Sequence, residues 1–125
     1  MAVSDDIVAA RCYGMVRCGE SSLSAPTVEE LATEFGLFFD ASCYRDIDEV
    51  SARMSIQNIL HRDMAYGDEV MAEQQAKQST DRFFAQFGNG VRFCTNNWCP
   101  ATNATFDEGV LVIGSQRSGC LWVEE

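Results

Sequence analysis

The stretch Gly109-Val110-Leu111-Val112-Ile113 is followed, after residues 114–119, by Cys120-Leu121-Trp122-Val123, and these two runs decide the fold class. Both runs are short, continuously apolar, and rich in β-branched and aromatic residues, which favours strands over helices. Glycines bound the segment between them, as is typical of a turn. We therefore predict a β-hairpin whose strands are buried on both faces of a sheet.

Upstream of this hairpin the pattern changes from helical to alternating. Residues 91–95 place Val, Phe and Thr at every second position, which is the period expected of a strand. Residues 1–88 carry apolar side chains at helical spacing, so about four helices are expected there. The expected helices begin at Ser4, Thr27, Asp46 and Asp68 and end near Gly19, Gly36, Arg62 and Phe87. Within the first of them, residues 12–18 have a strand as the alternative.

The most specific helix signal is the capping box Thr27-Val28-Glu29-Glu30. In this motif the Thr27 hydroxyl accepts a hydrogen bond from the Glu30 N–H, and the Glu30 carboxylate reaches back to the Thr27 N–H. Because helical patterns precede strand patterns, the predicted fold class is α+β with a small antiparallel sheet that ends in a C-terminal hairpin. We expect a single domain, 1–125, mainly helical over residues 1–88 and mainly strand over residues 90–125.

The composition limits the classes of partner. The 125 residues are 46% hydrophobic, and 19 acidic against 9 basic side chains give a net charge of −10. Contacts to phosphate need clustered Lys and Arg, so direct binding to nucleic acid or to an anionic membrane is not expected. The acidic excess lies in residues 1–50 and in the C-terminal tail. Neither a signal-sequence pattern nor an apolar run of membrane-spanning length is visible, so we expect a cytoplasmic protein.

The cysteines and the single histidine do not form a recognisable chemical motif. Six cysteines lie at positions 12, 18, 43, 94, 99 and 120. In a cytoplasmic chain, free and mostly buried thiols are favoured over disulfides. The Cys12–Cys18 and Cys94–Cys99 spacings are looser than those of zinc sites, and His61 is the sole histidine, so no metal or other cofactor is expected. No phosphate loop or nucleophile motif is present, and we expect no enzymatic activity.

The densest acidic cluster is the candidate binding site. Asp40, Asp46, Asp48 and Glu49, with Tyr44 among them, could form a docking patch for a basic partner, because clustered charge steers association. The alternative is a solvated helix start. Trp98 lies in the polar segment 96–100, where it could anchor a partner or fold back onto the core. Trp122, between Leu121 and Val123, is expected in the core.

The C-terminal residues also carry a family resemblance. Residues Thr105–Gly114, followed by Gly119–Glu125, resemble the closing hairpin of small bacterial immunity proteins, which protect cells against polymorphic toxins delivered by contact or by secretion systems such as type VI. The resemblance implies a cytoplasmic, non-enzymatic inhibitor that blocks the active or substrate-binding surface of a cognate toxin. The alternatives are a phage anti-defence inhibitor of the anti-CRISPR kind and a small enzyme or thiol protein with an unrecognised site.

Overall fold

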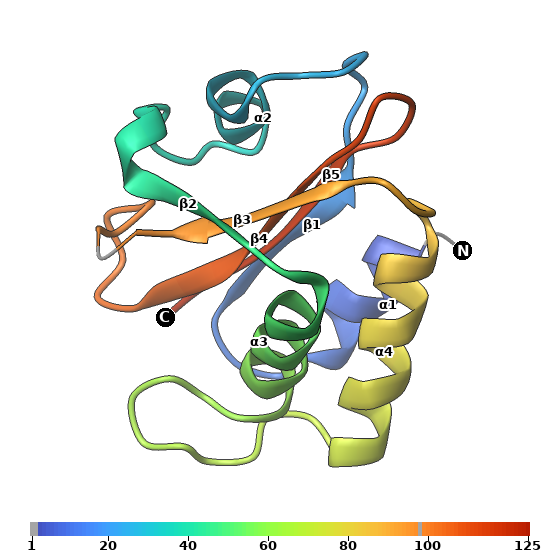
Figure 1. Ribbon diagram of the computed structural model, residues 1–125. Coiled ribbons are helices and arrows are strands. Elements are labelled where there is room, and N and C mark those ends of the chain that lie inside the picture. The colour runs from blue at the N-terminus through green and yellow to red at the C-terminus, as the bar shows by residue number, and fades with distance from the viewer. Residues whose placement is uncertain (1–2, 98) are drawn as a thin grey trace.

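A computed structural model of the protein describes residues 3–97 and 99–125 (Figure 1). In chain order the described residues form α1 (Val3–Ala10), β1 (Met15–Glu20), α2 (Val28–Glu34), the 3-10 helix η1 (Ala41–Cys43), β2 (Tyr44–Ile47), α3 (Glu49–His61), α4 (Glu73–Ala85), β3 (Arg92–Asn96), β4 (Asp107–Ile113) and β5 (Gly119–Glu124). The predicted α+β class is confirmed, although the helices do not all precede the strands. None of these helices combines the length and apolar character that crossing a membrane requires.

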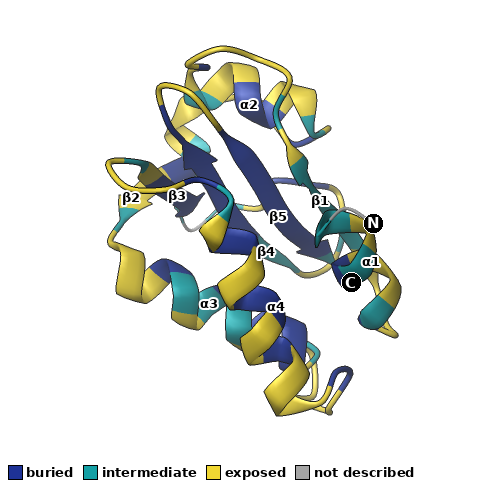
Figure 2. Cartoon of the chain, turned by 90° about the vertical axis from the view of Figure 1, so that its right-hand side faces the viewer, coloured by how far each residue is buried: buried dark blue, intermediate teal, exposed yellow. Residues whose placement is uncertain are grey.

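The five strands form one sheet in the order β1-β5-β4-β3-β2, and every neighbouring pair is antiparallel. The predicted hairpin is confirmed as β4 and β5, with Val110 opposite Leu121 and Leu111 opposite Cys120. Both strands are buried along most of their length (Figure 2). Continuously apolar strands need cover on both faces, which explains why this hairpin lies inside the sheet.

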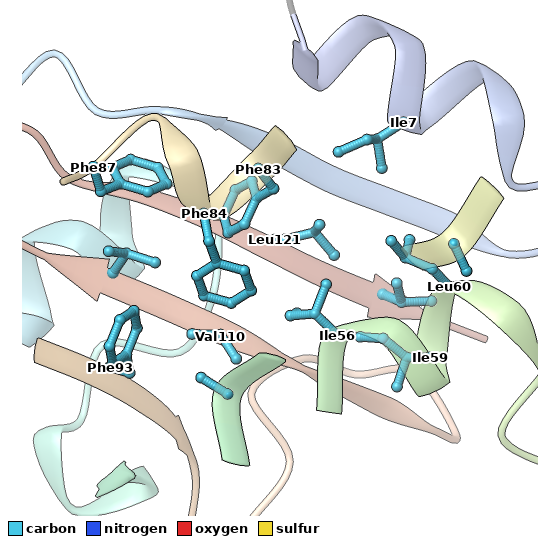
Figure 3. Close-up of a cluster of buried hydrophobic side chains, with 14 of the residues drawn as sticks. Ile7, Ile56, Ile59, Leu60, Phe83, Phe84, Phe87, Phe93, Val110 and Leu121 are labelled. Carbon is cyan, nitrogen blue, oxygen red and sulfur yellow. The ribbon is translucent and has the colours of Figure 1, made fainter. Parts of the chain in front are cut away.

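Helices cover the two faces of the sheet unequally. α1, α3 and α4 pack on one face, while the shorter α2 packs on the other (Figure 1). The larger cluster joins Ile7, Ile56 and Leu60 of the helices to Val110 and Leu121 of the hairpin (Figure 3). The smaller cluster lies under α2 and includes Leu31, Leu37, Tyr44, Leu111 and Trp122.

Aromatic rings fix both clusters. In the larger one, Phe83 meets Phe84 and Phe87 edge-on, with ring centroids 5.2 Å apart in each pair. In the smaller one, Trp122 is fully buried, as predicted. Its ring lies across Gly109, where an added Cβ would come within 2.2 Å of the Leu121 carbonyl oxygen and 2.6 Å of the Trp122 Cα. The absence of a side chain at residue 109 therefore permits the close approach of β4 and β5 around Trp122.

Three predicted helix boundaries are wrong. The first helix ends at Ala10, and residues 15–20 form β1, which was the open alternative. The third helix does not begin at Asp46, because residues 44–47 pair with β3, with Asp46 opposite Cys94. The fourth does not begin at Asp68, because residues 69–71 return to the end of α3, where the Val70 N–H donates to the His61 carbonyl at 2.8 Å. Pairing with distant residues overrides local helical pattern in each segment.

The helix α2 forms as its capping box predicts. The Glu30 N–H donates to the Thr27 hydroxyl at 3.1 Å, and the Thr27 N–H donates to the Glu30 carboxylate at 2.9 Å. The helix stops at Glu34, and Gly36 follows with a φ of +74°, a conformation that favours glycine. This early stop turns residues 37–40 away from the helix axis and places them beside it.

Candidate binding surface

Three of the four predicted acidic residues have partners close in sequence that explain their positions. Asp48 caps α3 by accepting from the Ser51 N–H at 2.7 Å, and Asp40 caps η1 by accepting from the Ser42 N–H at 3.0 Å. Glu49 accepts from Arg53 at 2.9 Å, one helical turn away. These contacts match the solvated helix start that was the alternative to a docking patch, at least for Asp48 and Glu49.

Asp46 belongs to a small polar cluster on the sheet rather than to a helix start. Its carboxylate accepts from Arg92 at 2.9 Å and from the Cys94 thiol at 3.1 Å. The thiol hydrogen bond and then the guanidinium hold the pKa of Asp46 below its ordinary value. Burial, followed by the neighbouring carboxylate, raises the pKa of Cys94 to about 12. The charge of Asp46 is thus balanced by Arg92 and contributes little to any attraction at a distance.

Of the two aromatic residues of the predicted site, the structure describes only Tyr44, and it is buried. Tyr44 is only 7% exposed, because its ring packs edge-on against Trp122 with centroids 6.0 Å apart. Its hydroxyl donates to the Phe38 carbonyl oxygen at 2.5 Å. Tyr44 is therefore a core residue that holds the segment before η1 in place, and its contact with a partner stays a prediction. Trp98 lies outside the described residues.

A different surface, formed by α2 and the segments beside it, combines apolar exposure with negative charge. A shallow groove of about 450 Å³ lies there, and its lining residues are Ser22, Leu23, Glu29, Glu30, Thr33, Glu34 and Phe39. We call these residues, together with the neighbouring Asp40, the α2 surface. Phe39 is 70% exposed and Leu23 is 40% exposed, so the apolar part is open to solvent. The outward side of α2 is correspondingly exposed in Figure 2.

Local folding explains why these side chains meet. Leu31 and Ala32 point into the smaller core cluster, which leaves the acidic side chains of α2 on its outer side. Glu34 accepts from the Ser22 N–H at 2.9 Å and also from the Ser21 hydroxyl, so the loop that carries Leu23 is held against the helix. Burial acts to raise the pKa of Glu34, but these hydrogen bonds outweigh it, so that the pKa is lowered. Glu34 therefore stays ionised at neutral pH.

The carboxylates of the α2 surface take no part in the ion pairs of the described residues, and Arg17, which donates to the Phe35 carbonyl oxygen at 3.1 Å, pairs with Glu124 instead. Residues 18–44 contain no Lys or Arg. Among the described residues, none of the ion pairs includes Glu29, Glu30, Glu34 or Asp40. Their hydrogen-bond donors are backbone N–H groups and hydroxyls, which satisfy the oxygens without cancelling the charge. The field of these four carboxylates is consequently open to a partner.

The thiols and His61 show little of what nucleophilic catalysis needs. Burial raises the pKa of Cys18 to about 12 and raises that of Cys120 well above its ordinary value, so both thiols stay protonated near neutral pH. The His61 Nδ1 lies 2.8 Å from the Met71 carbonyl oxygen. Its neighbouring groove of about 340 Å³ has no cysteine in its lining. Across residues 3–97 and 99–125, no group of three or more His, Cys, Asp or Glu side chains is arranged to hold a metal ion.

Comparison of the chain with protein-family models, curated proteins and solved structures found no match. The site therefore has to be judged from its own geometry. The sequence pattern indicates a binding patch at residues 40–49, and the geometry adds the α2 surface as a second candidate. One sequence signal points to this second candidate, since residues 18–44 hold five acidic residues and no base. The exposure of Phe39 had no sequence signal, because adjacent Phe residues are equally typical of a core.

Proposed function

We propose that this protein is an acidic, cytoplasmic, immunity-type inhibitor that binds a cognate bacterial toxin through the α2 surface and blocks its active or substrate-binding surface. One observation carries the proposal: an exposed Phe39 lies beside four carboxylates that belong to none of the ion pairs among residues 3–97 and 99–125. The resemblance of the C-terminal hairpin to immunity proteins is consistent with it. The function is one of binding, and no turnover is invoked.

The two components of the α2 surface have different roles in this proposal. A toxin that acts on nucleic acid must present a basic surface that holds phosphate groups. In the complex, this surface would bind the carboxylates of Glu29, Glu30 and Glu34 instead of phosphates. Long-range attraction between opposite charges raises the rate of association. Phe39 then supplies apolar area at the centre of the contact, where an aromatic side chain contributes most to affinity. A partner with a basic rim around an apolar depression fits both components.

The direct test is binding to the toxin encoded beside this gene. The purified protein and toxin are expected to form a 1:1 complex that abolishes toxin activity. The association rate should fall steeply between about 50 and about 500 mM salt, because screening shortens the reach of the charges. Surface plasmon resonance measures the rate, and a substrate assay measures inhibition. Absence of a complex at low salt would refute the proposal, and a nucleic-acid-binding defence complex as the partner would favour the phage anti-defence alternative.

A substitution at Phe39 tests which surface binds. We expect Phe39→Ala to weaken binding by roughly 10–100-fold, mainly through faster dissociation, with little change in the melting temperature. Tyr66→Ala is the matched control, because Tyr66 is an aromatic residue that is 85% exposed in the turn between α3 and α4. The control should bind within about twofold of the wild type. Equal binding by all three proteins would place the interface away from the α2 surface.

A further inference from the structure

Two cysteines from distant parts of the sequence are brought near each other at the β2 edge of the sheet. Cys43 ends η1 and Cys99 follows β3, and burial and then the neighbouring Cys99 thiol raise the pKa of Cys43. The backbone positions both residues: β2 and β3 pair with Tyr44 opposite Asn96, and the Asn97 N–H then donates to the Cys43 carbonyl oxygen at 2.6 Å. The Asn97 side chain donates to the Ser42 carbonyl oxygen at 3.4 Å and holds the same junction.

The other four cysteines lack this arrangement. The Cys12 thiol donates to the Val70 carbonyl oxygen at 3.1 Å, and the Cys94 thiol donates to Asp46. Cys18 and Cys120 lie on neighbouring strands, but Cys18 packs in the larger cluster and Cys120 in the smaller one, on opposite faces of the sheet. Side chains on opposite faces point apart and cannot be bridged without backbone movement.

Cys43 and Cys99 are also the pair that a small oxidant can reach. Both side chains are partly exposed, whereas Cys94 and Cys120 are buried. Proximity, accessibility and a backbone that ties Cys43 to Asn97, two residues before Cys99, all favour a disulfide. The structure itself contains both residues as free thiols.

We propose that Cys43 and Cys99 form a reversible disulfide that ties the segment after β3 to η1 when a small-molecule disulfide is available as oxidant. One thiolate of the pair attacks a sulfur of the oxidant and releases one small thiol. The second thiolate attacks the resulting mixed disulfide and releases the other small thiol. Two protons and two electrons thus pass from the protein to the oxidant, and one protein S–S bond forms. This modification site does not depend on the proposed toxin partner.

The bond would close a covalent loop over residues 43–99. That loop contains β2, α3, α4 and β3, so the disulfide would restrict the unfolded chain strongly. The raised pKa of Cys43 keeps its thiolate fraction small near neutral pH. Formation of the bond should therefore accelerate as the pH is raised, since the thiolate is the attacking form.

The test is oxidation of the whole chain by oxidised glutathione at about pH 8.5, followed by alkylation and mass spectrometry. We expect a mass loss of about 2 Da, from two hydrogen atoms, before alkylation of the remaining four thiols. Proteolysis should yield a peptide pair joined through Cys43 and Cys99. The oxidised protein should melt roughly 5–15 °C above the reduced protein, and a reductant should reverse the shift.

Three variants separate this bond from nonspecific oxidation. Cys12→Ser removes an exposed thiol outside the pair and should oxidise as the wild type does. Cys43→Ser and Cys99→Ser should each lose the crosslinked peptide and the melting shift, and should acquire a glutathione adduct on the remaining thiol. Wild-type protein that carries only glutathione adducts, or a crosslink mapped to another pair, would overturn the proposal. The wild-type peptide map decides the question even if one of the serine variants does not fold.

Discussion

The α2 surface and the three-helix side of the molecule use negative charge in different ways. Across α1, α3 and α4, carboxylates meet arginines: Asp6 pairs with Arg82 at 2.9 Å, and Arg53 lies between Glu49 and Asp81. On the α2 surface, carboxylates meet only backbone N–H groups and hydroxyls. Matched charge connects elements of the fold, whereas unmatched charge produces a field outside it. The difference separates acids that serve structure from acids that can serve binding.

The extreme case of matched charge lies where α1 ends. Arg11 is buried, donates to the Ile59 carbonyl oxygen at 2.7 Å, and pairs with the buried carboxylate of Glu125. The same carboxylate accepts from the Met64 N–H at 2.8 Å. This group therefore joins α1, α3 and the residue after β5. Removing one partner from such a group leaves the other buried without compensation.

The largest expected effect comes from breaking this buried pair. Arg11→Ala should lower the free energy of unfolding by about 3–5 kcal/mol, because Glu125 and several carbonyl groups lose their donor. Urea denaturation followed by circular dichroism measures the change. Arg82→Ala is the control, since the arginine is exposed and its partner Asp6 is partly exposed, and it should cost less than about 1 kcal/mol. Equal losses in the two variants would contradict the distinction between buried and exposed pairs.

The next effect concerns charge without a partner. Glu29→Lys reverses one charge on the α2 surface and should slow association with a basic toxin by up to about tenfold, with unfolding free energy nearly unchanged. Stopped-flow mixing at low salt measures the rate. Asp68→Lys makes the same charge change on an exposed residue between α3 and α4 and serves as the control. An equal slowing by both variants would mean that net charge, and not the α2 surface, governs association.

The smallest effect is a pH dependence at the exposed Asp46–Arg92 pair. Because the folded-state pKa of Asp46 is below the ordinary value of 3.8, its contribution to stability is present above that value and is lost as the pH falls through the folded-state pKa. Asp46→Asn should therefore lower the melting temperature slightly at neutral pH and leave it unchanged in strong acid. Melting curves from about pH 7 to about pH 2 test this sign. A larger deficit in acid than at neutral pH would contradict it.

The parts of the fold that sequence reasoning predicted are those with local causes. The capping box needs only Thr27 and Glu30, and the hairpin needs only two apolar runs joined by a short turn. The boundaries that were missed depend on distant partners. Residues 44–47 form β2 because β3 lies beside them, and no local pattern in those four residues predicts a strand.

The candidate site was harder to predict for the same reason. The sequence shows where acids are dense, but it does not show which acids are neutralised. The charge of Asp46 is balanced by Arg92, which is far away in the sequence, whereas Glu29 is in none of the ion pairs that the described residues form. The open position of Phe39 follows from the early end of α2 and the turn at Gly36.

The position of β5 has a consequence for how the chain folds as it is synthesised. β5 pairs with β4 on one side and with β1 on the other, so that Met15 lies opposite Glu124. β1 leaves the ribosome before the other four strands and has to wait, unpaired, until β5 has followed it. Such a distant pairing slows folding because the long intervening chain must be closed first. During that interval Val16 and Cys18 expose apolar surface, and this nascent segment is where chaperone contact or aggregation would begin.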